Sequence, residues 1–210
     1  MTIIMILIGI WIAYIVFRPK RKSKKNLSAP KKGKIETELV PYAMHGINVR
    51  SRVNADTWKR IARQAYMLNL ARFKLFKDEC EVCRGNGRQQ GFIHPLEAHE
   101  EWSFDHGART QKLTRIRSLC PLCHKAVHMG LSDKQGYGQQ ARKHMMRVNG
   151  WTAAQVQAHI DQAKQTVKTM NGMGKYKLDL TYLNHRDYAA THQVKFTGNE
   201  TSNCQPNTYE

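Results

Sequence analysis

Four cysteines in the middle of the chain are spaced as two metal-binding pairs. Cys80 and Cys83 form one Cys-x2-Cys pair, and Cys120 and Cys123 form the other. A tight turn lets both thiolates of such a pair reach one ion, so two pairs can close a tetrahedral four-thiolate site around zinc. Such a site is structural, because no coordination position is left for a substrate. We therefore expect a structural Zn²⁺ ion; the alternative is four unrelated buried cysteines.

Histidines provide a second set of potential ligands. His124 and His128 are four residues apart, so a helix that begins near His124 would carry both imidazoles on one face. His99 lies in an apolar run that indicates a strand, and it is the natural third ligand. Three protein ligands leave coordination positions open for water and a phosphate oxygen, as a hydrolytic site requires. The spacing predicts an open metal centre separate from the cysteines.

Periodic apolar residues predict the elements that would position these ligands. Helices are expected from Asn54 past Trp58, over residues 139–148, and from Ala153 to about Met170. Thr152 and Gln155 resemble a capping box in front of the last of these helices. Residues 176–182 alternate between apolar and polar and suggest one strand. These patterns predict an α+β fold.

The chain is strongly basic, and its charge is unevenly spread. Its 210 residues include 34 Lys+Arg and 16 Asp+Glu, which gives a formal net charge of +18. An excess of this size predicts a polyanionic partner, either nucleic acid or an anionic membrane surface. Residues 18–34 hold nine of the basic residues and no acidic residue. This block and the rest of the chain therefore need separate explanations.

The first residues predict a membrane anchor. Residues 2–17 carry no charge and form a stretch that is short but adequate for a membrane-spanning helix. No basic residue precedes the stretch, and Arg18-Pro-Lys-Arg-Lys22 follows it directly, which indicates a stop-transfer segment rather than a secretory signal. The positive-inside rule then places the N-terminus outside and the rest in the cytoplasm. A buried core helix is the alternative, and the adjacent basic block disfavours it.

The composition predicts four regions. Residues 1–17 are the expected transmembrane helix, and residues 18–40 are a basic linker rich in Lys, Pro and Ser. The linker either lies on anionic lipid headgroups or acts only as a topology signal. Residues 41–185 are the expected folded domain, and the polar residues 186–210 are an irregular tail.

The motifs resemble the HNH endonucleases, which are ββα-metal nucleases, in the variant with paired zinc knuckles. The resemblance rests on Leu96-Glu-Ala-His-Glu100 and on Leu119-Cys-Pro-Leu-Cys-His-x3-His128, within residues 78–130. It implies a ββα-metal core with a four-cysteine zinc site and helices on both sides, to which the N-terminal stretch would add a transmembrane helix. It also implies single-metal hydrolysis of phosphodiester bonds in DNA.

The resemblance implies a role for each residue of the motif. His99, His124 and His128 would bind the catalytic divalent metal, which could be Mg²⁺, Mn²⁺, Ni²⁺ or Zn²⁺. Glu100 occupies the position of the general base, where the family usually has histidine. A carboxyl group, with an ordinary pKa of about 4.3, is a weaker base near neutrality. Glu100 could instead be a second metal ligand, with His106 supplying the base from a nearby loop.

Basic residues near the motif are expected to bind the DNA backbone. The asparagine that gives the family its middle letter is missing, and its position falls at Arg115, which could hold a phosphate instead. Arg117 and Lys125 are further candidates for phosphate contacts that do not read bases.

These expectations combine into a metal-dependent DNA endonuclease, tethered by one N-terminal span to the cytoplasmic face of a bacterial inner membrane. A catalytically inactive, zinc-containing DNA-binding module is one alternative, and Glu100 in place of histidine is the feature that favours it. A membrane scaffold that binds protein or anionic lipid is the other. The sequence selects neither an oligomeric state nor a role in DNA uptake, conjugation or phage defence.

Overall fold

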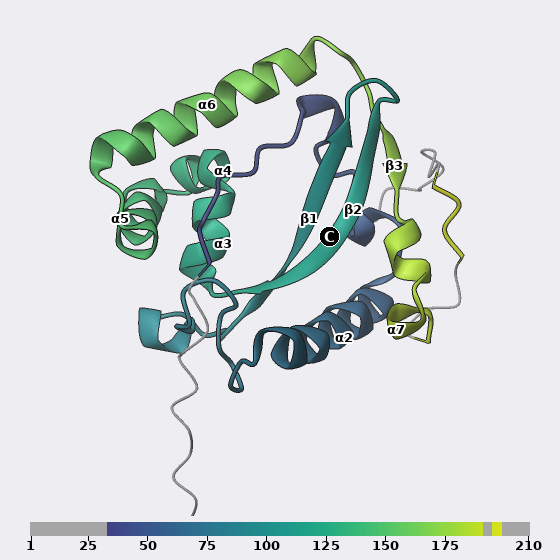
Figure 1. The fold of residues 1–210 in the computed structure, drawn as a ribbon, viewed down its shortest axis with the longest axis horizontal. Helices are drawn as coiled ribbons and strands as arrows, with labels where there is room; N and C mark the ends of the chain where they lie inside the picture. Colours follow the sequence, from purple (N-terminus) through teal and green to yellow (C-terminus); the bar gives the residue numbers. More distant parts are fainter. Residues whose placement is uncertain (1–32, 191–194, 199–210) are drawn as a thin grey trace, which may run out of the picture. The chain divides into compact units, whose positions relative to one another are not determined.

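The computed structural model describes residues 33–190 and 195–198. These residues form a mixed α and β structure with a three-stranded sheet and six α-helices (Figure 1). The predicted α+β fold class is therefore confirmed. The predicted span at residues 1–17 lies outside the described residues. None of the helices in the described part of the chain is both long and apolar enough to cross a bilayer.

A long antiparallel hairpin dominates the sheet. The strands are β1 (Glu97–Asp105), β2 (Thr110–Leu119) and β3 (Lys177–Asp179), in the order β1-β2-β3. β1 and β2 pair antiparallel, and His99 lies opposite Arg117. A β-bulge between Glu101 and Trp102 shifts the register. β3 pairs in parallel with the first residues of β2, so the expected strand at residues 176–182 is real but shorter than predicted.

The helices flank this hairpin. They are α2 (Ala55–Phe73), α3 (Pro121–Val127), α4 (Met129–Lys134), α5 (Gly138–Asn149), α6 (Ala153–Asn171) and α7 (Arg186–Ala189). The side chain of Asn54 accepts a hydrogen bond from the Thr57 amide at 2.8 Å and caps α2. Thr152 and Gln155 form the predicted capping box of α6. The three helices predicted from periodicity are therefore confirmed as α2, α5 and α6.

One apolar core joins α2 to the hairpin. Ile61 and Ala65 of α2 are buried in the same cluster as Leu113 and Ile116 of β2. The Asn69 amide group, also on α2, donates to the Ile116 carbonyl oxygen at 3.0 Å. This pairing satisfies polar groups that burial would otherwise leave without a partner. The hairpin is thus fixed on one side by a long helix.

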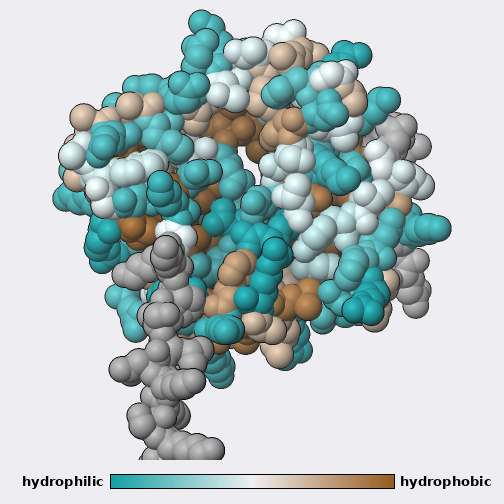
Figure 2. Space-filling model, viewed as in Figure 1, coloured by the Kyte–Doolittle hydropathy of each residue, from teal (hydrophilic) through white to brown (hydrophobic). Residues whose placement is uncertain are grey.

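A second core lies under α3, α5 and α6. Ala126 of α3, Met145 of α5 and Ile160 of α6 are buried in one cluster that also contains the cysteines Cys80 and Cys120. Figure 1 shows α2 on one side of the hairpin and α3 to α6 on the other. In the same view of the molecular surface, hydrophilic side chains lie at the centre, where the hairpin approaches α3 (Figure 2).

Residues 33–40 pack on the folded domain, although they fall within the expected linker. Ile35 is 1% exposed and belongs to the second core. The Asn149 side chain accepts from the Ile35 amide and donates to the Ile35 carbonyl oxygen, each at 2.8 Å. An extended segment that pairs its backbone in this way behaves as part of the fold. Ordered packing therefore begins before residue 41.

The start of the expected tail is also packed. Tyr188 of α7 and Phe196 are 3% and 2% exposed, and both join the core of α2 and the hairpin. The Asn184 side chain makes two hydrogen bonds with the Phe196 backbone, at 2.7 and 3.0 Å. These two aromatic side chains bury enough apolar surface to hold an otherwise polar stretch on the domain. The polar composition of the stretch did not predict this packing.

Candidate metal centres

The four cysteines of the two knuckles converge on one point. Their sulfur atoms lie within 4.8 Å of one another, and all four cysteines are free of disulfide bonds. Cys80 and Cys83 lie in the turn between α2 and β1, and Cys120 caps α3, with Pro121 in its first turn. Three of the cysteines are buried. The cluster could hold a structural metal such as zinc, as the spacing predicted.

Several N–H groups point at these sulfur atoms. The Gln90 side-chain amide donates to Cys120 Sγ at 3.1 Å, and the Gly85 amide donates to Cys83 Sγ at 3.4 Å. Donors of this kind stabilise thiolates and so fit a metal site with four anionic ligands. The sequence did not single out Gln90, because its loop has no periodic pattern.

His144 of α5 is a further neighbour of the cysteine cluster that the sequence did not indicate. Its Nε2 lies 3.2 Å from Cys123 Sγ, and its Nδ1 lies 2.9 Å from Arg147 Nη2. A guanidinium group can only donate, so Nδ1 must accept and Nε2 carries the proton that faces the sulfur. Burial alone would lower the pKa of His144, but hydrogen bonding to Cys120 and Cys83 outweighs it and raises this pKa. His144 is thus suited to donate to the cluster.

The three predicted histidines form a second cluster. His99 extends from β1, His124 lies on α3, and His128 is the residue at which α3 ends. Their nearest ring nitrogens lie within 4.8 Å of one another. His99 Nδ1 is 3.1 Å from His128 Nε2. The cluster could bind a metal ion, and the catalytic role of such an ion remains a prediction.

Burial keeps two of these imidazoles neutral. It lowers the pKa of His99 to about 3, and the neighbouring His124 adds to this effect. Burial also lowers the pKa of His128 to about 3, together with the other two histidines. Neutral imidazole is the form that binds metals, so near neutral pH both rings are ready to act as ligands.

Two carboxylates contact the outer nitrogens of the cluster. Glu97 Oε2 contacts His124 Nδ1, and this hydrogen bond lowers the pKa of Glu97 against the effect of burial. Glu38 Oε2 lies 3.1 Å from His99 Nε2. Burial raises the pKa of Glu38 to about 7, while the charge of Arg117 opposes this change. Metal-binding histidines commonly donate their second N–H to a carboxylate, and each pairing leaves the other ring nitrogen for a metal.

Glu100 lies on the sheet face opposite His99, because successive residues of a strand point to opposite faces. Its Oε1 accepts from the Val49 amide at 2.9 Å. Burial raises the pKa of Glu100 to about 7, although hydrogen bonds from the Val49 and Arg50 backbone oppose the change. The structure therefore does not bring the carboxylate predicted as the base to the histidine face.

His106 lies beyond the other end of β1, in the hairpin turn. Its Nδ1 is 2.9 Å from the Tyr176 hydroxyl. At about 3.3 Å per residue, the strand separates it from His99 by roughly 20 Å. The structure does not bring His106 to the cluster.

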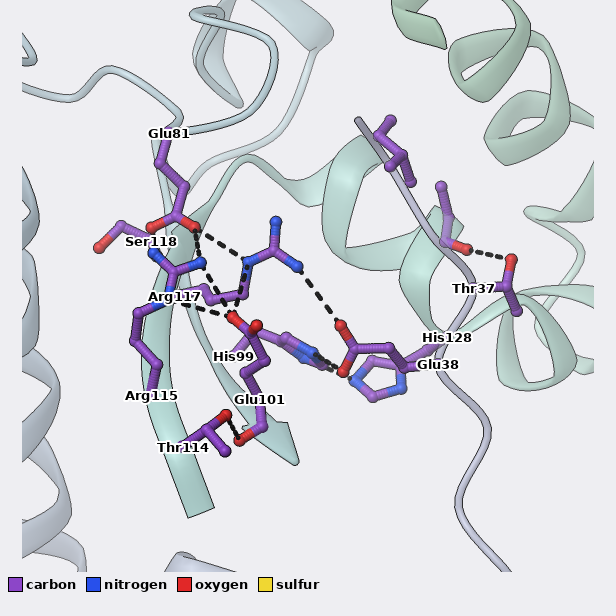
Figure 3. Close-up of polar contacts among 12 residues, drawn as sticks. Thr37, Glu38, Glu81, His99, Glu101, Thr114, Arg115, Arg117, Ser118 and His128 are labelled. Carbon is purple, nitrogen blue, oxygen red and sulfur yellow. Dashed lines mark hydrogen bonds and ion pairs between the residues drawn. The ribbon is translucent and has the colours of Figure 1, made fainter. Parts of the chain in front are cut away.

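The predicted phosphate-binding arginines are paired with carboxylates, as Figure 3 shows. Arg115 Nη2 lies 2.9 Å from Glu81 Oε1 and 2.9 Å from Glu101 Oε2. Arg117 donates from Nε to Glu81 at 2.9 Å and from Nη1 to Glu38 Oε1 at 3.3 Å. These carboxylates neutralise the charge of both guanidinium groups. The sequence pattern did not indicate the ion pairs, because the acidic partners lie on other segments of the chain.

Lys125 follows His124 on α3, and its ammonium group lies over two aromatic rings. Its Nζ lies 3.8 Å from the centroid of the Tyr137 ring and 5.6 Å from that of Phe92. Cation–π contacts of this kind hold an ammonium group in place without neutralising its charge. The charge of Lys125 also contributes to the low pKa of Glu97, the carboxylate that contacts His124.

Comparison of the chain with protein-family models, with curated proteins and with solved structures finds no significant match.

Proposed function

We propose that this chain is a metal-dependent DNA endonuclease built on a ββα-metal core of the HNH type. One observation carries the proposal: the hairpin β1–β2 and the following α3 gather His99, His124 and His128 within 4.8 Å, directly beside the four-cysteine cluster. The order of strand, strand and helix matches that implied by the sequence resemblance. The net charge of +18 supports a polyanionic substrate.

The histidine cluster fits a catalytic divalent metal. Two of its imidazoles are neutral near pH 7, and all three belong to rigid elements or their ends. A bound ion would polarise the scissile phosphate and stabilise charge on the leaving 3′ oxygen. Three imidazole ligands could bind Mg²⁺, Mn²⁺, Ni²⁺ or Zn²⁺. The four-cysteine cluster, which leaves no position for a substrate, would hold zinc and fix α3 to the knuckles.

Lys125 is proposed as a contact to the DNA backbone, because its charge lies on the same helix as two of the ligands. Arg115 and Arg117 would contact phosphate by exchanging a carboxylate partner for it. Glu100 and His106, the predicted bases, lie away from the histidines, and neither can activate a water beside them without a change of conformation. The N-terminal apolar stretch and basic block support a tether to the cytoplasmic face of a membrane.

The proposal predicts metal-dependent nicking of supercoiled plasmid by the full-length chain in detergent. Activity is expected with Mg²⁺, Mn²⁺ or Ni²⁺, and His124→Ala should lower it by about 10³-fold, because a metal contributes several kcal/mol to phosphodiester hydrolysis. Nicking that is equal in wild type and His124→Ala would refute the proposal. Salt-sensitive DNA binding without any nicking would favour the inactive DNA-binding module. Binding only to anionic vesicles would favour the scaffold.

A second prediction concerns Glu100. Because its carboxylate accepts from the backbone on the face opposite the histidines, Glu100→Gln should keep nicking within about tenfold of wild type. It should cost about 1–3 kcal/mol of unfolding free energy, because the Val49 and Arg50 backbone amides both donate to the carboxylate and glutamine keeps only one acceptor oxygen. Single-turnover nicking and thermal unfolding measure the two effects. A loss of about 10²-fold or more at unchanged stability would instead identify Glu100 as the base.

A further inference from the structure

Residues 33–40 form an extended segment that crosses α3 and is held along its length (Figure 1). The Gly33 amide donates to the Val82 carbonyl oxygen at 3.1 Å, and the Thr37 amide donates to His159 Nε2 at 2.8 Å. The Glu38 amide then donates to the Val127 carbonyl oxygen at 3.0 Å, at the last residue of α3. Backbone hydrogen bonds therefore fix the position from which the Glu38 side chain extends.

The two carboxylate oxygens of Glu38 have different partners (Figure 3). Oε2 lies 3.1 Å from His99 Nε2, and Oε1 accepts from Arg117 Nη1 at 3.3 Å. His99 and Arg117 are themselves paired across the hairpin. The Glu38 carboxylate thus bridges two side chains that the sheet already holds next to each other, so its position is set from both ends.

This arrangement selects one tautomer of His99. A histidine that binds a metal through one ring nitrogen commonly donates its other N–H to a carboxylate, so the Glu38 carboxylate beside His99 Nε2 favours the tautomer with the proton on Nε2. The other ring nitrogen, Nδ1, is then left with its lone pair, and it is the nitrogen that lies 3.1 Å from His128 Nε2. His99 is therefore presented to the cluster as a neutral, correctly oriented ligand.

We propose that Glu38 is a positioning residue of the histidine centre: it fixes the tautomer and orientation of His99 from a segment 61 residues before it in the chain. The inference rests on the proposed function only in that the histidines bind a metal. It also makes the centre depend on the docking of residues 33–40, a segment that begins within the last residues of the basic block. Docking or undocking of this segment would change metal affinity without any change in the three ligands.

Glu38→Gln tests the inference in the full-length chain, in detergent, with zinc retained. We expect the affinity for Mn²⁺, measured by isothermal titration, to fall by about 10–100-fold, as for other carboxylates that orient metal-binding histidines. Glu38→Asp, with the carboxylate kept, should recover part of this loss. Glu36→Gln is the matched control, because Glu36 lies on the same segment but is exposed. It should bind Mn²⁺ within about twofold of wild type.

A structural role alone would change stability rather than the protonation of His99. We therefore expect ¹⁵N NMR of the wild-type imidazoles to show a proton on His99 Nε2. A proton on Nδ1, or Mn²⁺ affinity of Glu38→Gln equal to that of wild type, would overturn the inference. A wild-type chain that binds no Mn²⁺ would overturn it too. Mn²⁺ binding that depends on Glu38 but gives no plasmid nicking would refute the nuclease function and support the positioning role.

Discussion

Replacing Cys120 by serine should remove the structural metal and unfold much of the domain. Cys120 is fully buried, accepts from the Gln90 amide group and caps α3. Structural zinc sites contribute about 10–16 kcal/mol to folding in zinc-finger peptides, which exceeds or matches the net stability of about 5–15 kcal/mol of ordinary domains. Metal analysis should give about one zinc ion per wild-type chain and almost none per mutant, and the cooperative thermal transition should disappear.

Cys204→Ser is the matched control for this experiment, because Cys204 is outside the two pairs and outside the described residues. It should keep both the zinc and the thermal transition. A Cys120→Ser chain that unfolds at the wild-type temperature would show that the four cysteines are merely buried side chains.

His128→Ala should have the second-largest effect, and of a different kind. The side chain supplies one of the three imidazoles of the histidine cluster, and the residue is half-buried. Its loss should abolish Mn²⁺ binding at this centre and reduce nicking by about 10³-fold. Zinc content and the unfolding temperature should stay close to wild type, because the cysteine cluster stabilises α3 separately.

His185→Ala is a suitable control, since His185 is exposed and its ring contacts Asp187 rather than the cluster. It should bind Mn²⁺ and nick plasmid as wild type does. If His128→Ala lost zinc together with Mn²⁺, the two clusters would not be independent centres, and the division between scaffold and active site would be wrong.

Local spacing was enough to predict the two cysteine pairs and the pair of His124 and His128. The two turns of Cys-x2-Cys and the helical spacing of His124 and His128 are properties of short segments, so the sequence contains them directly. The start of α6 was predictable for the same reason, because the capping box of Thr152 and Gln155 is local. Features of this kind do not depend on how distant segments pack.

The surroundings of the clusters depend on distant segments and were not predictable. Glu38 lies in a stretch whose composition indicates a linker, and only its backbone pairing with α3 brings it to His99. The ion pairs of Arg115 and Arg117 also require Glu81, which lies in the turn between α2 and β1 and is distant from both arginines in the sequence. The position of Glu100 differs from these cases because it depends only on local structure. Side chains alternate between the two faces of a strand, so Glu100 and His99 must point to opposite faces.

The most direct test of the account is the location of metals in crystals of the full-length protein grown with Mn²⁺. Anomalous scattering measured at the zinc and manganese edges distinguishes the two ions by position. We expect zinc among Cys80, Cys83, Cys120 and Cys123, and manganese among His99, His124 and His128 with coordination positions open to solvent. Manganese absent from the histidines, or one ion bound jointly by cysteines and histidines, would contradict it.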